Sequence, residues 1–321
     1  DRIDREIKVL VKQGNFANIT GNGVAEIDDL NWRDNRIKKT SLELDLKEGK
    51  AFITKLDVRL DDQNRVGIKG DIGLAEKNPF HLDWDVDLTN LASLAPWIRS
   101  SPTTLPSAGV ITSTGKSSGN VANLMEQDFE GLQVDGAGLF NGIVWQNARL
   151  NEAAWDASYT DGRVNVRKLE VQFDDRNTIT AKGHGKLDQA GEFDAEVSAS
   201  LTELSALSGW MELAKQPKIT TGRASLNWKG GGKIADREIQ GSGILDISEL
   251  KLEGKKEVFA LAVELSHQGK RAEITKLRAS ADKMVAEASM ALTDTDLTVS
   301  KLNLSSGATR LLEGTMNLPL A

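Results

Sequence analysis

The sequence predicts an all-β protein of tandem antiparallel β-meander repeats, forming a long twisted, curved β-groove (a β-taco) with short helices between the units. Three observations carry this prediction: apolar and polar residues alternate with a period of two, short turn sequences separate the alternating runs, and a long segment recurs further along the chain. Strict alternation indicates strands with one apolar and one polar face, because strands covered on both faces read as continuous apolar runs.

The internal repeat is the strongest of these signals. Residues 23–97 match residues 136–210 at a constant offset of 113 without a gap, and a weaker third copy begins at Gly241, where the offset falls to about 107–108. Residues 1–20 resemble the end of a preceding copy. We therefore expect one elongated repeat domain with units at 21–133, 134–240 and 241–321, the last of them incomplete.

Within a unit, the alternation divides into about five runs. The run 41–47 places three leucines on one side and three charged residues on the other, and 55–61, 65–74 and 80–88 follow the same pattern. Polar turns such as KEGK at 47–50 and DDQN at 61–64 separate the runs. Gly70 interrupts the third run, which predicts a bulge or a close approach of another strand there.

After the fifth run the spacing changes. Apolar residues in 90–99 and 203–215 recur every three or four positions, which predicts a short helix that Thr89 or Thr202 is placed to cap. A crossing strand then follows, at 109–116 in the first unit and 222–229 in the second.

A sheet that is apolar on one face throughout must cover that face, and a long curved sheet with an apolar inner face is the simplest solution. That inner face is the candidate functional surface. The residues expected to line it are Leu42, Leu44, Leu46, Leu56, Val58, Leu60, Val66, Ile68, Ile72, Phe80, Leu82, Trp84, Val86, Trp155, Leu169, Val171, Phe173, Ile179, Phe193 and Val197.

Six of the seven tryptophans fall into two groups. Four recur at matched positions, as expected of structural wedges: Trp32, Trp97, Trp145 and Trp210. Trp84 and Trp155 are not matched by tryptophan and project to the apolar face. For these two, a packing role and a ligand-lining role both stay open.

Composition excludes several classes of function. The net charge of −7 argues against a nucleic-acid-binding protein and against a polybasic membrane-surface module. Without cysteine there is no disulfide, thiol catalysis or cysteine-ligated zinc. No apolar run reaches the roughly 18 residues of a membrane span, and the chain opens in strand-like alternation rather than with a signal peptide. This opening favours an internal piece of a longer protein.

The chemical motifs of enzymes do not fit either. Five residues separate Gly109 from Gly115, whereas a phosphate-binding loop has four. The repeated Asp pairs at 61–62 and 174–175 lack the glycine and glutamate of a calcium loop, so a strand-end turn is favoured over a metal site. The three histidines do not cluster. We therefore predict a protein that is not an enzyme, with no catalytic residue, metal or cofactor.

Tandem meander units, an LTxLxxLxxW helix after the fifth strand (88–97 and 201–210), a glycine-rich returning strand and one apolar face together resemble the AsmA-like/TamB superfamily of Gram-negative envelope proteins. The resemblance covers nearly the whole chain. It implies a periplasmic repeating β-groove, with an inner-membrane anchor outside this fragment. It also implies an inner surface that shields acyl chains of phospholipid, or of another acyl-chain lipid, during transport between the inner and outer membranes, which supports outer-membrane homeostasis.

Two other functions remain open at this point. The chain could be a scaffold for the assembly of outer-membrane proteins or autotransporters, offering a sheet edge to a β-barrel partner. It could also be a structural or adhesive surface array whose inner face is only its core. The lipid hypothesis has independent physical support, because each buried CH₂ group is worth roughly 0.8 kcal/mol and needs no polar contact.

Overall fold

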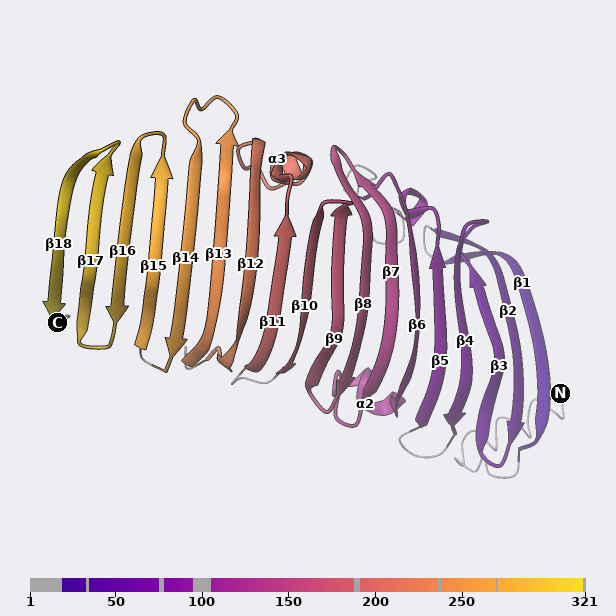
Figure 1. The fold of residues 1–321 in the computed structure, drawn as a ribbon. Coiled ribbons are helices and arrows are strands. Elements are labelled where there is room, and N and C mark those ends of the chain that lie inside the picture. Colours follow the sequence, from indigo (N-terminus) through magenta and orange to yellow (C-terminus); the bar gives the residue numbers. More distant parts are fainter. Residues whose placement is uncertain are drawn as a thin grey trace. The chain divides into compact units, whose positions relative to one another are not determined.

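The computed structural model describes residues 19–32, 35–74, 78–94, 105–187, 191–235, 238–269 and 271–319. Within these ranges, eighteen strands belong to one open antiparallel sheet and the helices are short (Figure 1). The predicted all-β meander is confirmed. The chain forms two compact units, Asp1–Ile143 with Trp155–Val164, and Val144–Ala154 with Asn165–Ala321.

In the first unit, each strand from β1 to β6 pairs with the next strand in the sequence. A 3₁₀-helix, η1 (Leu91–Leu94), follows β5, and a five-residue helix that the sequence did not predict, α2 (Val121–Met125), follows β6. The strands are β1 (Gly21–Trp32), β2 (Asn35–Lys47), β3 (Lys50–Arg59), β4 (Asn64–Gly73), β5 (Pro79–Leu88) and β6 (Ala108–Asn120).

In the second unit, consecutive strands from β10 to β18 pair in the same way. The helices η3 (Leu204–Leu207) and α3 (Ser208–Leu213) follow β11. Three strands are divided between the two units: β7 (Gln133–Trp145), β8 (Ala148–Thr160) and β9 (Arg163–Asp174). The strands wholly within the second unit are β10 (Asn177–Lys186), β11 (Glu192–Leu201), β12 (Ile219–Lys233), β13 (Glu238–Leu252), β14 (Phe259–Gln268), β15 (Arg271–Ala281), β16 (Met284–Leu292), β17 (Asp296–Ser306) and β18 (Thr309–Pro319).

The first two sequence repeats have matching elements. The bounds of β2, β4, β5 and η1 recur in β8, β10, β11 and η3 at the same offset of 113. The third repeat differs, because a tight turn at Gly307 joins β17 directly to β18 and no helix lies between them. The reason is local: after the fifth strand the sequence reads SGATRLLEG at 306–314, where the other repeats have an LTxLxxLxxW segment.

A β-bulge that the sequence did not reveal recurs in the third strand of a repeat. The pairing register shifts between Ile53 and Leu56 in β3, and between Ile274 and Leu277 in β15. In each case the bulged threonine donates its hydroxyl hydrogen to a neighbouring carbonyl oxygen, over 3.1 Å from Thr54 and 3.3 Å from Thr275. The extra residue reverses the alternation, so Ile53 and Leu56 share a face although they are three positions apart.

Gly70 confirms the predicted close approach. Its φ is +144°, and a Cβ atom at this position would lie 2.0 Å from the carbonyl oxygen of His81 on the neighbouring strand. Only glycine fits such a contact, since no side chain can occupy that space.

A buried asparagine connects the β3–β4 turn to η1. Asn64 is 1% exposed, and its Nδ2 atom donates to Asp61 Oδ2 at 2.9 Å, to the carbonyl oxygen of Asn90 at 2.9 Å and to Ser93 Oγ at 2.7 Å. Asn177, which is fully buried, makes the equivalent bonds to Asp174 and Glu203. The asparagine of the repeated DDxN sequence therefore connects the turn to the start of the following helix through hydrogen bonds.

Thr89 and Thr202 are not helix caps, contrary to the prediction. Thr89 Oγ1 donates to the carbonyl oxygen of Gln63 at 2.7 Å, and Thr202 Oγ1 to that of Arg176 at 3.0 Å. Glu203 occupies the N-cap position of η3 without a side-chain capping bond. The threonines instead join the end of the fifth strand to the DDxN turn, because that turn presents an accepting carbonyl within reach.

Candidate functional site

In the first unit, the pairing register arranges the predicted lining residues in rows that run across the strands. Leu42, Leu56, Ile68 and Trp84 are successive cross-strand partners on β2 to β5. Parallel rows contain Val58, Val66 and Val86; Leu44, Ile53 and Leu82; and Leu46, Ile72 and Phe80. Leu60 lies beside the β3–β4 turn, where its backbone N–H donates to the carbonyl oxygen of Asn64.

These side chains are half-buried, with the exception of Phe80, which is 3% exposed. They cover one another along and across the strands, yet most of them are not sealed from solvent by a second layer. A face of this kind differs from a closed core, in which most large apolar side chains are fully buried.

In the second unit, longer rows continue through the third repeat. Seven inter-strand spacings of about 4.8 Å give a row from β10 to β17 a length of roughly 34 Å. One such row contains Ile179, Ala199, Leu226, Leu245, Val263, Leu277, Ala288 and Leu302. A second row, from β11 to β17, contains Val197, Trp228, Gly243, Leu265, Ile274, Met290 and Val299. The alternation in β13 to β17 is the signal that identifies the members beyond residue 197, which the sequence prediction omitted.

Tryptophans on this face lie against glycines on neighbouring strands. A Cβ atom on Gly115 would lie 2.3 Å from Trp84 Cζ2, and one on Gly138 would lie 2.4 Å from Trp155 Nε1. In the second unit Trp228 lies against Gly243 in the same way and stacks on Phe193, with ring centroids 6.5 Å apart. Each large ring thus occupies the space that a glycine leaves empty, which gives Trp84 and Trp155 a packing role.

The tryptophan has changed strand between repeats. Trp84 pairs with Gly115 in the first repeat, whereas Val197 pairs with Trp228 at the matched positions of the second. We expect Gly115→Trp to cost about 1–3 kcal/mol of unfolding free energy, because it overpacks the row. Adding Trp84→Val should recover most of that loss. A double-mutant cycle tests this: the unfolding free energies of both single variants and of the double variant are measured in urea. If the losses of the two single variants simply add in the double variant, the two positions do not compensate each other and the expectation is wrong.

The predicted lining residues of β9 have a different environment. Phe173 packs edge-on against Trp210 of α3, with ring centroids 5.9 Å apart at 71°, so a helix covers it. Trp210 Nε1 also donates to the carbonyl oxygen of Arg149 at 2.8 Å. Val171 is half-buried, while Leu169 is 37% exposed. Trp97, and the side chain of Trp32, lie outside the described residues.

One apolar hollow opens on β13 to β17 of the second unit. It has a volume of about 520 Å³ and is lined almost wholly by carbon atoms. Its walls include Ile247, Leu252, Phe259, Leu261, Ala281 and Met284. The size is in the range of small-ligand sites, but no convergent set of polar groups is present to orient a reacting molecule.

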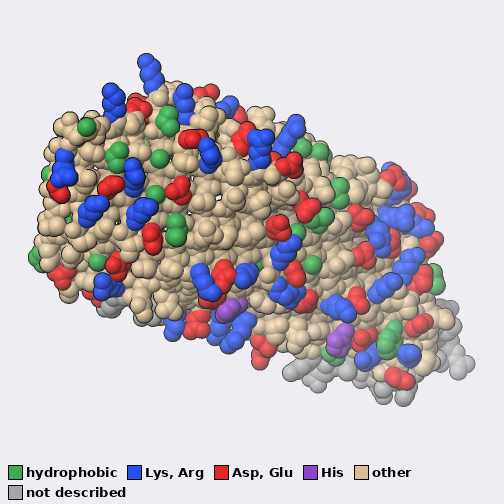
Figure 2. Space-filling model, in the orientation of Figure 1, with side chains coloured by type: hydrophobic (Ala, Val, Ile, Leu, Met, Phe, Trp, Pro, Cys, Tyr) green, Lys and Arg blue, Asp and Glu red, His purple; other side chains and the backbone are tan. Residues whose placement is uncertain are grey.

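The opposite face of the sheet is charged (Figure 2). Asp57, which is buried, accepts hydrogen bonds from Arg59 and Arg65, and Arg65 also donates to Asp85 at 2.6 Å. Gly67 leaves room for this network, since a Cβ atom there would lie 2.3 Å from Asp85 Oδ1. Burial raises the pKa of Asp57, but the bonds from the two arginines outweigh burial and lower it below its usual value.

Asp57→Asn should lower the unfolding free energy by about 1–3 kcal/mol at pH 7, because it removes the charge that the arginines bind. The folded-state pKa of Asp57 lies below the unfolded value of about 3.9, so this stability is present above pH 4 and is lost as the pH falls through the folded pKa. The difference in unfolding free energy between Asp57→Asn and the parent chain, measured by urea unfolding, should therefore become smaller from pH 7 to pH 3. Asp62→Asn, at an exposed carboxylate, is the control. If the difference in unfolding free energy for Asp57→Asn does not change with pH, the arginines do not stabilise the charged form of Asp57.

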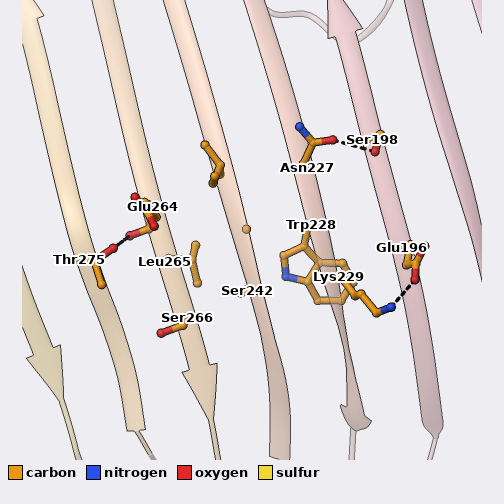
Figure 3. A pocket seen from close by; sticks show the side chains of 12 residues that line it. Glu196, Ser198, Asn227, Trp228, Lys229, Ser242, Glu264, Leu265, Ser266 and Thr275 are labelled. Atoms are coloured by element: carbon orange, nitrogen blue, oxygen red, sulfur yellow. Dashed lines mark hydrogen bonds and ion pairs between the residues drawn. The ribbon is translucent and has the colours of Figure 1, made fainter.

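A polar trough of about 610 Å³ also lies on this charged face, across β11 to β15 (Figure 3). Glu196 bridges Lys182 and Lys229, whose hydrogen bonds lower the pKa of Glu196 to about 2. Ser198 donates to Asn227 Oδ1 at 2.9 Å. Two charged groups that line the trough, Glu196 and Lys229, are thus paired with each other within the sheet, as expected of a solvated, salt-bridged surface.

Among the described residues, no group of three or more histidine, aspartate or glutamate side chains is placed to hold a metal ion. The Asp61 carboxylate is engaged by Ser93, Gln63 and Asn64. No helix in the described ranges has the length and hydropathy of a membrane span. No protein-family model, curated protein or solved structure matches the chain.

Proposed function

We propose that this chain is a non-catalytic lipid-shielding surface, whose apolar rows cover the acyl chains of phospholipid, or of another acyl-chain lipid, in transit across the periplasm. The observation that carries the proposal is the continuity of the rows: within each unit, apolar side chains succeed one another from strand to strand. The resemblance to AsmA-like/TamB proteins supports the same reading and the envelope location.

The dimensions of the rows suit an acyl chain. A bilayer's hydrocarbon core is about 30 Å thick, so a single leaflet is about 15 Å deep, less than half the roughly 34 Å length of a row in the second unit. Each CH₂ group removed from water contributes roughly 0.8 kcal/mol. A chain can therefore lie on the row, or move along it, without specific polar contacts, while its headgroup stays in water.

The proposal predicts that lipid copurifies with the protein. After expression in a Gram-negative host and purification without detergent, mass spectrometry of an organic extract should show phospholipid in near-stoichiometric amount. A fluorescent acyl probe should bind the delipidated chain and be displaced by phospholipid. Protein that is free of lipid when isolated natively, and that takes up no probe, would overturn the proposal.

One observation favours a second candidate, strand addition to a β-barrel partner. Every residue of β18 is exposed, including Leu311 and Met316. An edge of this kind can accept a strand from another chain. Crosslinks confined to β18, in a chain whose apolar face tolerates charged substitutions without loss of function, would favour that role over lipid shielding.

A further inference from the structure

The apolar hollow in the third repeat corresponds to a site that a helix fills in the second repeat. In the second repeat, Phe173 is the last apolar residue of the third strand before the turn, and Asn177 begins the fourth strand after it. The residues in the same two places of the third repeat are Ala281 and Met284, which pair with each other and both line the hollow.

The helix of the second repeat is held at this site by apolar anchors. Leu204 of η3 is 6% exposed and lies 3.2 Å from the Cβ position of Gly222, while Trp210 of α3 packs against Phe173. Asn177 fixes the start of η3 through Glu203, whose backbone N–H donates to Asn177 Oδ1 at 3.1 Å. Leucine and tryptophan, six positions apart in two consecutive short helices, thus both anchor the helical segment to strands of the sheet.

The third repeat lacks both the helix and the two residues that receive it. Alanine replaces phenylalanine, and methionine, 39% exposed, replaces the buried asparagine. The β17–β18 turn supplies no segment to cover the strands. The result is an open, apolar site of about 520 Å³ where the preceding repeat is filled by its own helix.

We propose that the hollow binds a short amphipathic helix of a partner protein, with an aromatic side chain seated on Ala281 and Met284 as Trp210 is seated on Phe173. The rim supports an apolar rather than an ionic anchor. The loop beside Leu252 carries Lys255 and Lys256 but also Glu253 and Glu257, so neither sign of charge dominates. This argues against a site built for an anionic headgroup and favours recognition through apolar side chains on one face of a helix.

The chain itself supplies the probe. A fluorescein-labelled peptide with the sequence of residues 201–215 should bind the full chain in fluorescence anisotropy, and Ala286→Phe, which fills the hollow, should weaken binding about tenfold or more. Ala279→Leu is a milder filling variant in case the first unfolds. Thr298→Phe adds an equal ring at an exposed position of β17 and should leave binding unchanged. A peptide with alanine in place of its tryptophan should bind about tenfold more weakly.

Two results would overturn the inference: the peptide does not bind, or it binds Ala286→Phe and Ala279→Leu with the same affinity as the parent chain. The competing occupant of the hollow is a lipid acyl chain, which photocrosslinking with a diazirine-bearing phospholipid tests. If the phospholipid labels Met284 and the chain does not bind the peptide, the hollow binds acyl chains instead. Ile68→Asp, in the other unit, should leave peptide binding intact while it impairs lipid uptake. Failure of the helix site and failure of the lipid function are therefore separable.

Discussion

Ile68→Asp is expected to reduce lipid uptake and transfer at least about tenfold. Ile68 lies in the middle of a row, between Leu56 and Trp84 on the neighbouring strands, and is half-buried. An acyl chain that lies across the row would have to desolvate the new carboxylate, which costs several kcal/mol, and each 1.4 kcal/mol is a factor of ten in affinity. The measurement is transfer of a fluorescent phospholipid between donor and acceptor vesicles.

The matched control is Lys69→Asp, which places the same residue one position further along β4 on the opposite, charged face. That variant should transfer lipid at close to the parent rate. Leu277→Asp repeats the test in the second unit, where its neighbours are Val263 and Ala288. Circular dichroism and urea unfolding identify variants that fail to fold. Normal transfer by a folded Ile68→Asp chain would contradict the lipid-shielding function.

Asn64→Ala is expected to lower the unfolding free energy by about 2–4 kcal/mol, and Asn177→Ala by a similar amount. Each asparagine is almost completely buried, and its amide group joins a turn to a helix. Removing the amide leaves the Asn90 backbone N–H without the Asn64 Oδ1 atom that accepts from it, and takes one hydrogen bond each from the Asn90 carbonyl and the Asp61 carboxylate. Such groups cost about 1–3 kcal/mol each when they are left unpaired.

Met284→Ala provides the control for the asparagine variants, because Met284 occupies the matched place in the third repeat and is 39% exposed. It should cost less than about 1 kcal/mol. Equilibrium urea unfolding of the three variants makes the comparison. If Asn64→Ala and Asn177→Ala each lower the unfolding free energy by less than about 0.5 kcal/mol, the hydrogen bonds between the DDxN turn and the helix do not stabilise the fold.

The third repeat is where the chain departs from its own pattern, and the two proposals meet there. Loss of the LTxLxxLxxW segment, of Phe173 and of Asn177 at matched positions together converts a filled helix site into an open hollow. The rows on the adjoining strands remain continuous through this change. Repeats of this kind can therefore keep a common apolar face while individual units gain or lose a docking site at the strand ends.

Alternation and the 113-residue offset were sufficient to predict antiparallel meander strands, the short helices that follow the fifth strand and the apolar face, although not the helix α2. These features depend on local spacing, since side chains two positions apart share a face of a strand wherever that strand is placed. The same reasoning placed the members of the first-unit rows, such as Leu42, Ile68 and Val86, on one face.

Other features depended on which strands became neighbours. The bulge at Thr54 brought Ile53 to the apolar face, and the pairing of β5 with β6 placed Trp84 over Gly115. Phe173 came to lie against Trp210, and Asn64 reached Asn90, the residue before η1 and 26 positions further along. None of these contacts has a local sequence signature, because each depends on register and on groups brought together from distant segments. The spacing of residues along the chain determines on which face of a strand a side chain lies. Its neighbour on the adjacent strand is determined only when the strands pair in a particular register.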